Sequence, residues 1–509
     1  MKTISIDNSE LTLEDLIAVS RGHARIELAQ NARKRIEAAR DRVDTWVREG
    51  RSIYGVTTGF GALSDVAIST RDARLLQENI LKSHACGMGN LFPEDVVRAI
   101  IALRIKDLAK GHSGIRLQTV DMLIEIVNHH TIPVVPEKGS VGASGDLVPL
   151  AHLSLVLIGL GEAFHEGKRL PGRDALQRIG LTPIVLHAAE GLALINGTQV
   201  MTAVGALAVS DAENLVRNID IAASMSLEVL MGSNTEFDPR IHDVRPHPGQ
   251  SVSAANMRRI TGDSGIISSH KDCKRIQDAY TLRCSPQVHG ASRDAVFYAR
   301  KVIEVEMNAA TNNPLIFADS DEFLLGGNFH GQPVALAMDF LCMAVAELAN
   351  ISERRVERLV NPKLSGLPAF LTDDGGLNSG FMIAQYAAAA LVSENKVLSH
   401  PACVDSIPTS ANKEDHVSMG TISARKAAEI VKNTENVIAV ELLCAAQAID
   451  LFTNARPGKG TKAAYDVIRR HIPHLEKDRV LADDIEAMVR LIRSKKILRA
   501  VEDQVGPLG

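Results

Sequence analysis

Long stretches of this sequence carry apolar residues at three- and four-residue spacing, the pattern of α-helices that pack into a core. Three such stretches span about residues 332–360, 381–398 and 421–452, and a proline follows each of the first two. Each is longer than the average globular helix of roughly 11–12 residues. Additional alanines widen the apolar surface, so each helix needs neighbours on several sides. The pattern predicts a mainly α fold with a bundle of long, near-parallel helices, completed by other subunits.

The pattern changes toward both ends of the chain. Up to about residue 200, short helical stretches alternate with glycine-containing turns such as YGVTTGFGALSD and GNLFPED. From about residue 455, a polar GKGTK loop leads into shorter amphipathic helices. No internal repeat, low-complexity tract or Gly/Ser-rich linker marks a boundary. We expect a smaller, loop-rich N-terminal region, 1–200, and a long-helix region with C-terminal helices, 201–509, joined as one continuous unit.

Composition and charge narrow the class of protein. Of the 509 residues, 45% are hydrophobic and 23% charged, as in soluble globular proteins. Aromatic residues make up only 4%, so aliphatic side chains must fill the core. A net charge of −5 gives no electrostatic reason to expect a nucleic-acid or membrane partner.

The cysteines and the N-terminus bear on the compartment. The six cysteines are widely spaced without a CxxC pair, which is typical of reduced thiols. The N-terminus has no apolar signal core, and the best apolar run, Leu147 to Leu160, is too short to span a bilayer. These features predict a soluble, cytoplasmic protein.

The segment KGSVGASGDLVPLAH contains the tripeptide Ala143-Ser144-Gly145. Its glycine spacing is not the dinucleotide fingerprint, no Gly-Lys-Ser/Thr completes a phosphate loop, and GASG is not a nucleophile elbow. No H-E-x-x-H occurs, so we expect neither a nucleotide nor a metal. Two interpretations stay open, a glycine-rich turn that caps a helix and a backbone cyclisation. In the second, the Gly145 amide nitrogen attacks the Ala143 carbonyl carbon, and loss of water, including the Ser144 hydroxyl, leaves an electrophilic methylidene carbon.

Other polar loops carry candidate functional residues. They are Tyr54 in YGVTTGFG, Asn196 in LINGTQ, Gln277, Tyr280 and Arg283 in IQDAYTLRCSPQVHG, Phe329 in GGNFHGQP, and Glu414 in SANKEDHVSMG. Taken singly, each is more often structural, as a packed tyrosine or a helix C-cap. Tyr280 and Arg283 are three residues apart, so on a helix they share a face, and an arginine there suits bidentate capture of a carboxylate.

These segments, with ILKSHACG, NNPLIF and ISERRVERLVNP, resemble the signature blocks of the aromatic amino acid ammonia-lyases. The similarity extends from about Leu11 to past Ala446, with the blocks in the family's order. It implies the long-helix bundle of the ammonia-lyase (fumarase/aspartase-like) type, with a loop-rich N-terminal region that carries the prosthetic group. That group is 4-methylidene-imidazol-5-one, formed from Ala143, Ser144 and Gly145. The resemblance also implies a homotetramer whose active sites are assembled from three subunits.

The resemblance assigns a role to each candidate residue. The methylidene derived from Ser144 would bond the substrate amine, and Tyr54 would remove the β-proton. Tyr54, Ser144 and Glu414 are thus the candidate catalytic residues. Arg283 with Tyr280 would hold the substrate carboxylate, Asn196 and Gln277 would hydrogen-bond near the prosthetic group, and Phe329 would line the pocket. Asp146 would assist ring formation, although capping of the helix that follows is an equally good interpretation.

Two residues indicate which amino acid is the substrate. His84, in ILKSHACG, occupies the position that selects the side chain within the family, and Glu414 can pair with an imidazole N–H. A carboxylate buried against a phenyl ring would be left unpaired at considerable cost. The pair therefore favours L-histidine, which would give trans-urocanate and ammonia. Lys413 and His112 stand where the family is expected to have glutamine and phenylalanine, and both bear on the pocket.

Three alternatives stay open from the sequence. A tyrosine-specific lyase and an aminomutase that returns ammonia to the β-carbon would use nearly the same residues, with lid motion deciding whether product escapes. A non-catalytic helical scaffold is the third, and its chain would keep both waters that ring formation removes.

Overall fold

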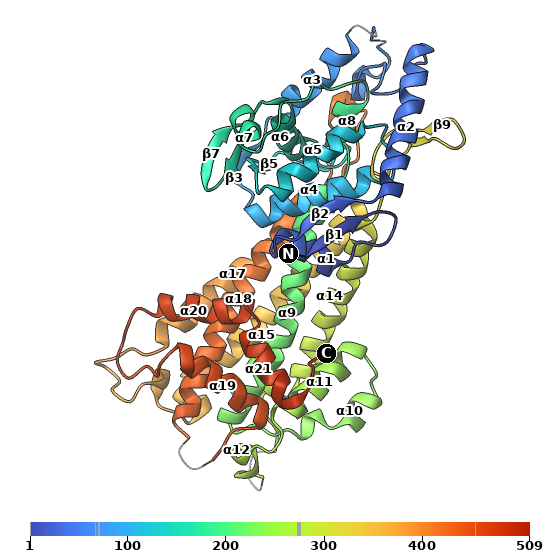
Figure 1. The fold of residues 1–509 in the computed structure, drawn as a ribbon. Helices are drawn as coiled ribbons and strands as arrows, with labels where there is room; N and C mark the ends of the chain where they lie inside the picture. The colour runs from blue at the N-terminus through green and yellow to red at the C-terminus, as the bar shows by residue number, and fades with distance from the viewer. Residues whose placement is uncertain (1, 67, 70–71, 272–275, 453–454) are drawn as a thin grey trace. The chain divides into compact units, whose positions relative to one another are not determined.

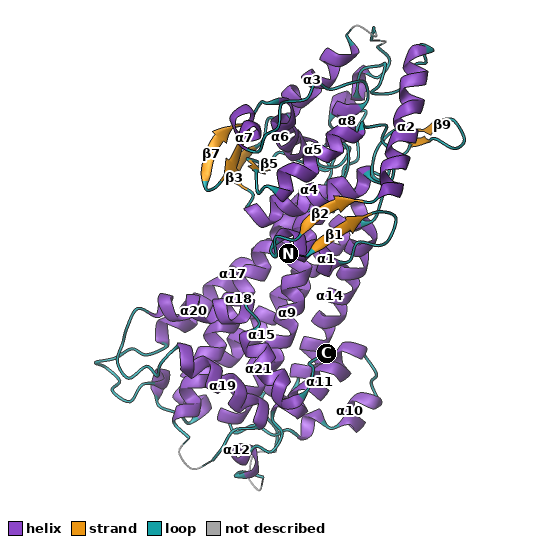
Figure 2. Cartoon of the chain, viewed as in Figure 1, coloured by secondary structure: helices purple, strands orange, loops and turns teal. Residues whose placement is uncertain are grey.

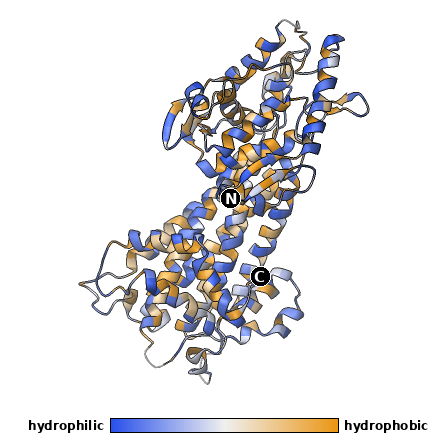
Figure 3. Ribbon diagram, in the orientation of Figure 1, coloured by the Kyte–Doolittle hydropathy of each residue, from blue (hydrophilic) through white to orange (hydrophobic). Residues whose placement is uncertain are grey.

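The computed structural model describes residues 2–66, 68–69, 72–271, 276–452 and 455–509. Helices dominate the described chain, and the strands form small sheets (Figure 2). The prediction of a mainly α fold is confirmed. Apolar residues recur along the helices, interspersed with polar ones (Figure 3).

The chain divides into two compact units, each assembled from three separate segments. Unit 1 comprises residues 1–207, 300–339 and 401–425, and unit 2 comprises residues 208–299, 340–400 and 426–509. Four long helices contribute residues to both units: α9 (Gln199–Val229), α14 (Ser285–Met307), α15 (Gln332–Val360) and α18 (Gly420–Asp450). Figure 1 shows these elements in chain order by colour.

Unit 1 also contains short helices and all of the described strands. The helices are α1 (Leu13–Ser20), α2 (Gln30–Arg48), η1 (Gly61–Leu63), α3 (Ala73–His84), α4 (Glu94–Leu108), α5 (Leu117–Asn128), α6 (Leu147–Leu155), η2 (Val156–Ile158), α7 (Gly172–Arg178), α8 (Glu190–Ile195) and η5 (Ser410–Asn412). The strands are β1 (Thr3–Ile6), β2 (Arg25–Leu28), β3 (Met88–Leu91), β4 (Ile132–Pro133), β5 (Pro136–Lys138), β6 (Glu162–His165), β7 (Lys168–Pro171), β8 (Leu315–Phe317) and β9 (Glu322–Leu324). β1 pairs with β2 in parallel, whereas β3–β5, β4–β6–β7 and β8–β9 are antiparallel.

The regular elements among the described residues of unit 2 are all helices, joined by loops. Besides its parts of the four long helices it contains η3 (Thr235–Phe237), α10 (Pro239–Asp243), α11 (Pro248–Ile260), α12 (Gly265–Ser268), α13 (Tyr280–Arg283), α16 (Pro362–Ser365), η4 (Ala369–Leu371), α17 (Met382–Leu398), α19 (Lys459–His471), α20 (Leu481–Arg493) and α21 (Lys496–Val505).

The three long stretches predicted from the apolar pattern are α15, α17 and α18. α15 ends where Asn361 caps the next helix, α16, which begins with Pro362 because proline fits the first helical position. The expectation that Leu147 to Leu160 is the best apolar run was wrong, since α15 is long and apolar enough to cross a membrane. Most of that apolar window is buried in the protein, as in the core helix of a globular unit.

Helix α4 forms the centre of unit 1. Every residue from Val96 to Leu108 is buried, including Arg98, Arg104 and Asp107. Charged side chains are this deeply buried only where other polar groups satisfy them. Two short helices near α4 hold the loops described below: α6 begins just after Gly145, and α8 ends just before Asn196.

Candidate active site

The tripeptide Ala143-Ser144-Gly145 lies in a turn between β5 and α6. Ser144 has a φ of 51° and Gly145 a φ of 77°, in the left-handed region. A Cβ added to Gly145 would lie 2.1 Å from the carbonyl oxygen of Gly197, far inside contact distance. Only glycine fits at position 145, because both the backbone angle and the close approach exclude a side chain.

Asn196 and Gly197 clamp this turn from the other side. The Gly197 amide donates to the Ser144 carbonyl at 3.2 Å, and its own carbonyl accepts from the Asp146 amide at 2.8 Å. The Asn196 side chain is satisfied when its Nδ2 donates to the Ser144 carbonyl at 3.0 Å and its Oδ1 accepts from the Asn313 amide at 2.7 Å. The predicted place of Asn196 beside the tripeptide thus has direct contacts.

Asp146 is fully buried directly after the tripeptide. Its Oδ2 accepts from the amides of Val200 (3.0 Å) and Met201 (2.8 Å), in the first turn of α9. Its Oδ1 accepts from Ser140 Oγ at 3.0 Å and from Thr421 Oγ1. Of the two interpretations of Asp146, side-chain capping of the following helix was wrong, because the carboxylate makes no hydrogen bond to α6 and accepts from amides of α9 instead. Burial raises the pKa of Asp146, and the hydrogen bonds oppose this shift.

A cavity of about 530 Å³ opens beside the tripeptide. Tyr54, His84, Ser144 and Glu414 all line it, so four of the predicted residues come together. The rest of its described wall is largely apolar, and includes Phe60, Leu63, Leu76, Ile80, Leu147 and Leu192. Motif analysis missed this wall because its apolar residues have no distinctive spacing. A cavity with few polar groups aimed at one place is typical of a small-molecule site.

Burial shifts the pKa of both Tyr54 and His84. The Tyr54 hydroxyl accepts from the Gly61 amide at 3.1 Å, and its ring meets Phe60 edge-on at 6.4 Å between centroids. Burial raises the pKa of Tyr54, the Gly61 amide opposes this, and the Glu414 carboxylate raises it further. Burial lowers the pKa of His84, whose Nδ1 lies 3.0 Å from Ser83 Oγ. His84 is therefore a neutral imidazole at pH 7.

Glu414 is half-buried, and its Oε2 accepts from Thr409 Oγ1 at 3.1 Å. Lys413 extends to a different loop, where its Nζ donates to Ser64 Oγ at 2.9 Å. The other family departure, His112, packs against β8, with Nδ1 2.8 Å from the Ile316 carbonyl. The two departures thus have partners of their own, and Glu414 keeps its carboxylate for the cavity.

Five predicted substrate-binding residues lie outside the described cavity wall: Asn196, which contacts the tripeptide backbone instead, and Gln277, Tyr280, Arg283 and Phe329. Phe329 is half-buried in the loop before α15. Gln277, Tyr280 and Arg283 belong to unit 2, where Gln277 is exposed and Tyr280 is 70% exposed. The expected shared helical face is confirmed, because Tyr280 and Arg283 form α13 and the guanidinium lies 4.6 Å from the centre of the tyrosine ring.

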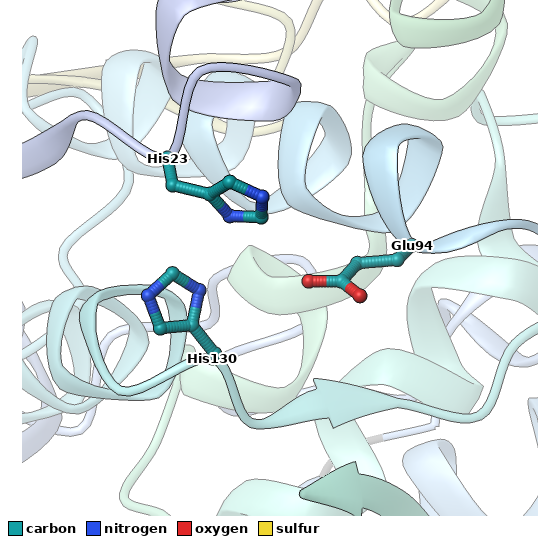
Figure 4. A group of neighbouring side chains, drawn as sticks. All are labelled: His23, Glu94 and His130. Carbon is teal, nitrogen blue, oxygen red and sulfur yellow. The ribbon is translucent and has the colours of Figure 1, made fainter. Parts of the chain in front are cut away.

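A second group of polar side chains lies elsewhere in unit 1. His23, Glu94 and His130 face one another, with potential metal-ligand atoms within 4.8 Å (Figure 4). However, Arg98 Nη1 lies 2.9 Å from His130 Nδ1, so this nitrogen accepts from a buried cation. In the neutral ring Nε2 then carries the proton. A metal ion bound through Nδ1 of His130 would have to displace the Arg98 guanidinium, which already supplies a positive charge there.

Comparison with known proteins identifies the family of the chain. Residues 11–470 match the family described as aromatic amino acid lyase. Histidine ammonia-lyase from Alkaliphilus oremlandii is 57% identical over 505 residues, covering 99% of both chains, and that from Caldanaerobacter subterraneus subsp. tengcongensis is 55% identical over 504 residues, covering 99% of both. The structure is similar to histidine ammonia-lyase from Trypanosoma cruzi, with a TM-score of 0.92 and 44% identity, covering 99% of this chain and 96% of that one. It is also similar to tyrosine aminomutase from Streptomyces globisporus, with a TM-score of 0.93 and 38% identity, covering 99% of both.

The fold and these relatives define an enzyme of the carbon–nitrogen lyase class. Within that class, the chain belongs to the aromatic amino acid lyase family.

Proposed function

We propose that the chain is a histidine ammonia-lyase, which eliminates ammonia from L-histidine to give trans-urocanate, the first step of histidine degradation. The observation that carries this proposal is the cavity that gathers Tyr54, His84, Ser144 and Glu414 beside the strained tripeptide. The full-length relatives named histidine ammonia-lyase support the choice of substrate.

The tripeptide fits a 4-methylidene-imidazol-5-one group. As the bond from the Gly145 nitrogen to the Ala143 carbonyl carbon forms, the nitrogen's proton moves to the Ala143 oxygen. That oxygen leaves as water with the Ser144 amide proton, and Ser144 Oγ leaves as a second water with the Ser144 α-proton. The clamp by Gly197 and the missing Cβ of Gly145 favour the close approach this requires. When formed, the group supplies an electrophile that turns the substrate amine into a better leaving group.

Tyr54 is the base that takes the β-proton in this proposal. Only its phenolate can accept that proton, and burial within this chain raises its pKa, which favours the phenol. The activating positive charge must then come from the assembled enzyme or from the bound substrate. The amide of Gly61, which already donates to the Tyr54 oxygen, would also favour the phenolate.

The substrate carboxylate requires a cation, and Arg283 is the residue we assign to it. Arg283 and Tyr280 share α13, and Gln277 precedes them, all in unit 2. We propose that they reach a cavity of another subunit, so that the enzyme works as a homotetramer with shared active sites. Tyr280, 70% exposed in the single chain, is available for that role. Phe329 would then line the completed pocket.

His84 and Glu414 set the substrate in the completed pocket. A neutral His84 can hydrogen-bond an imidazole, and the Glu414 carboxylate can accept its N–H. A phenyl side chain would leave that carboxylate unpaired. Cys86, Cys284 and Cys444 are free thiols, which supports a reducing compartment, and we propose the cytoplasm.

A substrate panel tests the function. Purified protein is incubated separately with L-histidine, L-tyrosine and L-phenylalanine, and the ultraviolet absorbance of the conjugated product is followed. We expect urocanate from L-histidine and little product from the other two. Coumarate from L-tyrosine would identify a tyrosine-specific lyase, and a β-amino acid would identify an aminomutase. Ser144→Ala should keep the fold and abolish both the loss of two waters and turnover; an active variant would contradict the role of Ser144.

A further inference from the structure

A buried polar network supports the Asn196-Gly197 clamp from the side away from the tripeptide. At its centre is Arg104 of α4, whose side chain is fully buried. Its guanidinium donates to the carbonyls of Ala193 (2.5 Å) and Asn196 (2.9 Å) and to Gln199 Oε1 (2.6 Å). One side chain therefore connects the last turn of α8, the clamp and the first residue of α9.

Asp107 extends the network to a third segment. Its Oδ2 lies 3.1 Å from Arg104 Nη2 and accepts from Gln199 Nε2 at 3.3 Å. Its carboxylate also accepts from the amide and the hydroxyl of Thr311, both at 3.3 Å, and Gln199 Nε2 donates to that hydroxyl at 2.9 Å. Thr311 lies two residues before Asn313, whose amide bonds the Asn196 side chain. Both the backbone and the side chain of Asn196 are thus held by the same network.

The network also presses directly on Gly197. A Cβ added there would lie 2.5 Å from Gln199 Oε1 and from Thr311 Oγ1, and 2.8 Å from Arg104 Nη1. The other side of Gly197 is taken by its hydrogen bonds to Ser144 and Asp146. There is no free space between the network and the clamp at Gly197. A displacement of the network side chains therefore displaces the clamp.

We propose that Arg104, with Asp107 as its counterion, is a positioning residue that fixes Asn196 and Gly197 against the tripeptide, both for ring formation and for turnover. This inference rests on the proposed function, since it assumes that the tripeptide cyclises. Its chemical basis is the planar fork of the guanidinium, which bonds acceptors of Ala193, Asn196 and Gln199 at once. A lysine keeps the charge beside Asp107 but loses that fork.

Helix α4 offers a matched control in Arg98. Its side chain is also almost inaccessible to solvent, and it donates to the carbonyls of Val19 and Val127, each at 3.0 Å, and to His130. These partners are at the ends of α1 and α5, away from the clamp. Arg98→Lys therefore removes another buried guanidinium from the same helix without changing the contacts of Asn196 and Gly197.

The experiment compares wild type, Arg104→Lys, Arg98→Lys and Thr311→Val. Intact-chain mass gives the fraction that has lost two waters, and kcat and KM are expressed per dehydrated chain. We expect both lysine variants to lower the melting temperature. Of the two lysine variants, only Arg104→Lys should also lower the dehydrated fraction or reduce kcat per dehydrated chain, by about tenfold to a hundredfold for a displaced reacting group. KM should stay near the wild-type value, because Arg104 lies outside the described cavity wall.

Thr311→Val keeps the branched shape of the side chain and replaces the hydroxyl by a methyl group, which can make no hydrogen bond to Asp107 or Gln199. Like Arg104→Lys, it should lower kcat and leave KM near the wild-type value, but the loss of kcat should be smaller. If Arg104→Lys does not fold, Thr311→Val is the variant that tests the inference. If Arg104→Lys folds, loses both waters completely and keeps the wild-type kcat, this inference is overturned while the proposed function stands. If Arg104→Lys does not fold, the same result in Thr311→Val overturns this inference. The same defect in Arg98→Lys would also overturn it, because the effect would then be general destabilisation. A wild-type chain that retains both waters overturns the proposed function itself, and this inference with it.

Discussion

Replacement of Gly145 by alanine tests the steric basis of the tripeptide turn. The added Cβ would lie 2.1 Å from the Gly197 carbonyl oxygen, and contacts below 3.0 Å essentially do not occur, so the clamp must move by 3.0 − 2.1 = 0.9 Å. Such a shift disrupts the Asp146-to-Gly197 hydrogen bond of 2.8 Å, worth about 1 kcal/mol. Alanine at a φ of 77° adds roughly 1–2 kcal/mol. We expect a total loss of about 2–3 kcal/mol in the free energy of unfolding, and no ring formation.

Gly167 is the matched control for this variant. Its φ is 73°, almost the same as that of Gly145, but an added Cβ would meet nothing within 4 Å. Gly167→Ala should cost only the roughly 1–2 kcal/mol of the backbone angle and should leave the loss of two waters complete. Urea unfolding gives the stability difference, and intact-chain mass gives the dehydration. If Gly145→Ala loses both waters and is no less stable than Gly167→Ala, the steric account of the turn is wrong.

Three further predictions concern single groups. Tyr54→Phe should keep the loss of two waters but lower kcat by about 10²–10⁴-fold, as expected for a general base. Because burial raises the pKa of Tyr54, the activity of the wild type should rise with pH above neutrality. A rate profile that is flat from about pH 7 to 10 would count against the phenolate. Glu414→Gln should lower kcat/KM for L-histidine more than for L-tyrosine, and equal losses would remove Glu414 from substrate selection. In unit 2, burial raises the pKa of Glu228 from 4.5 to about 8, so the folded chain holds this proton more tightly than the unfolded chain. The resulting stability is fully present below pH 4.5 and is lost as the pH rises through 8, by at most about 5 kcal/mol. Glu228→Gln, which keeps an acceptor for the Gly458 amide, should therefore raise the melting temperature at pH 9 and change it little at pH 4; no gain at pH 9 would show that Glu228 is ionised at little cost.

The long helices could be predicted because their signal is local. Periodic apolar residues and a following proline place α15 and α17, and the apolar repeat alone places α18. Motif order likewise brought attention to Tyr54 and Glu414, which the structure places on one cavity. The helical pattern depends on residues that are neighbours in the sequence, and the site residues were found through sequence blocks shared with a known family.

Long-range contacts could not be predicted in the same way. Asp146 looked like the cap of the helix that follows it, yet its acceptors serve α9 and Thr421, which come much later in the chain. Arg104 and Asp107 were indistinguishable from surface charges until α4 proved to be buried on every side. The assembly of each unit from three segments also leaves no mark on composition, because the long helices pass through the unit boundaries without a linker.

The hydrogen bond between Asp146 and Thr421 has a consequence for when the proposed ring could form during synthesis. The two residues are 275 positions apart, and at roughly 5–20 residues per second a ribosome needs about 14–55 s to make the chain between them. Until then, the carboxylate next to Gly145 lacks one of its partners, and the third segment of unit 1 does not yet exist. A nascent chain, or one terminated before Thr421, therefore cannot complete the surroundings of the tripeptide. If the tripeptide cyclises as proposed, the ring would form only after Thr421 has been made, which would keep the proposed electrophile out of shorter ribosome-bound fragments.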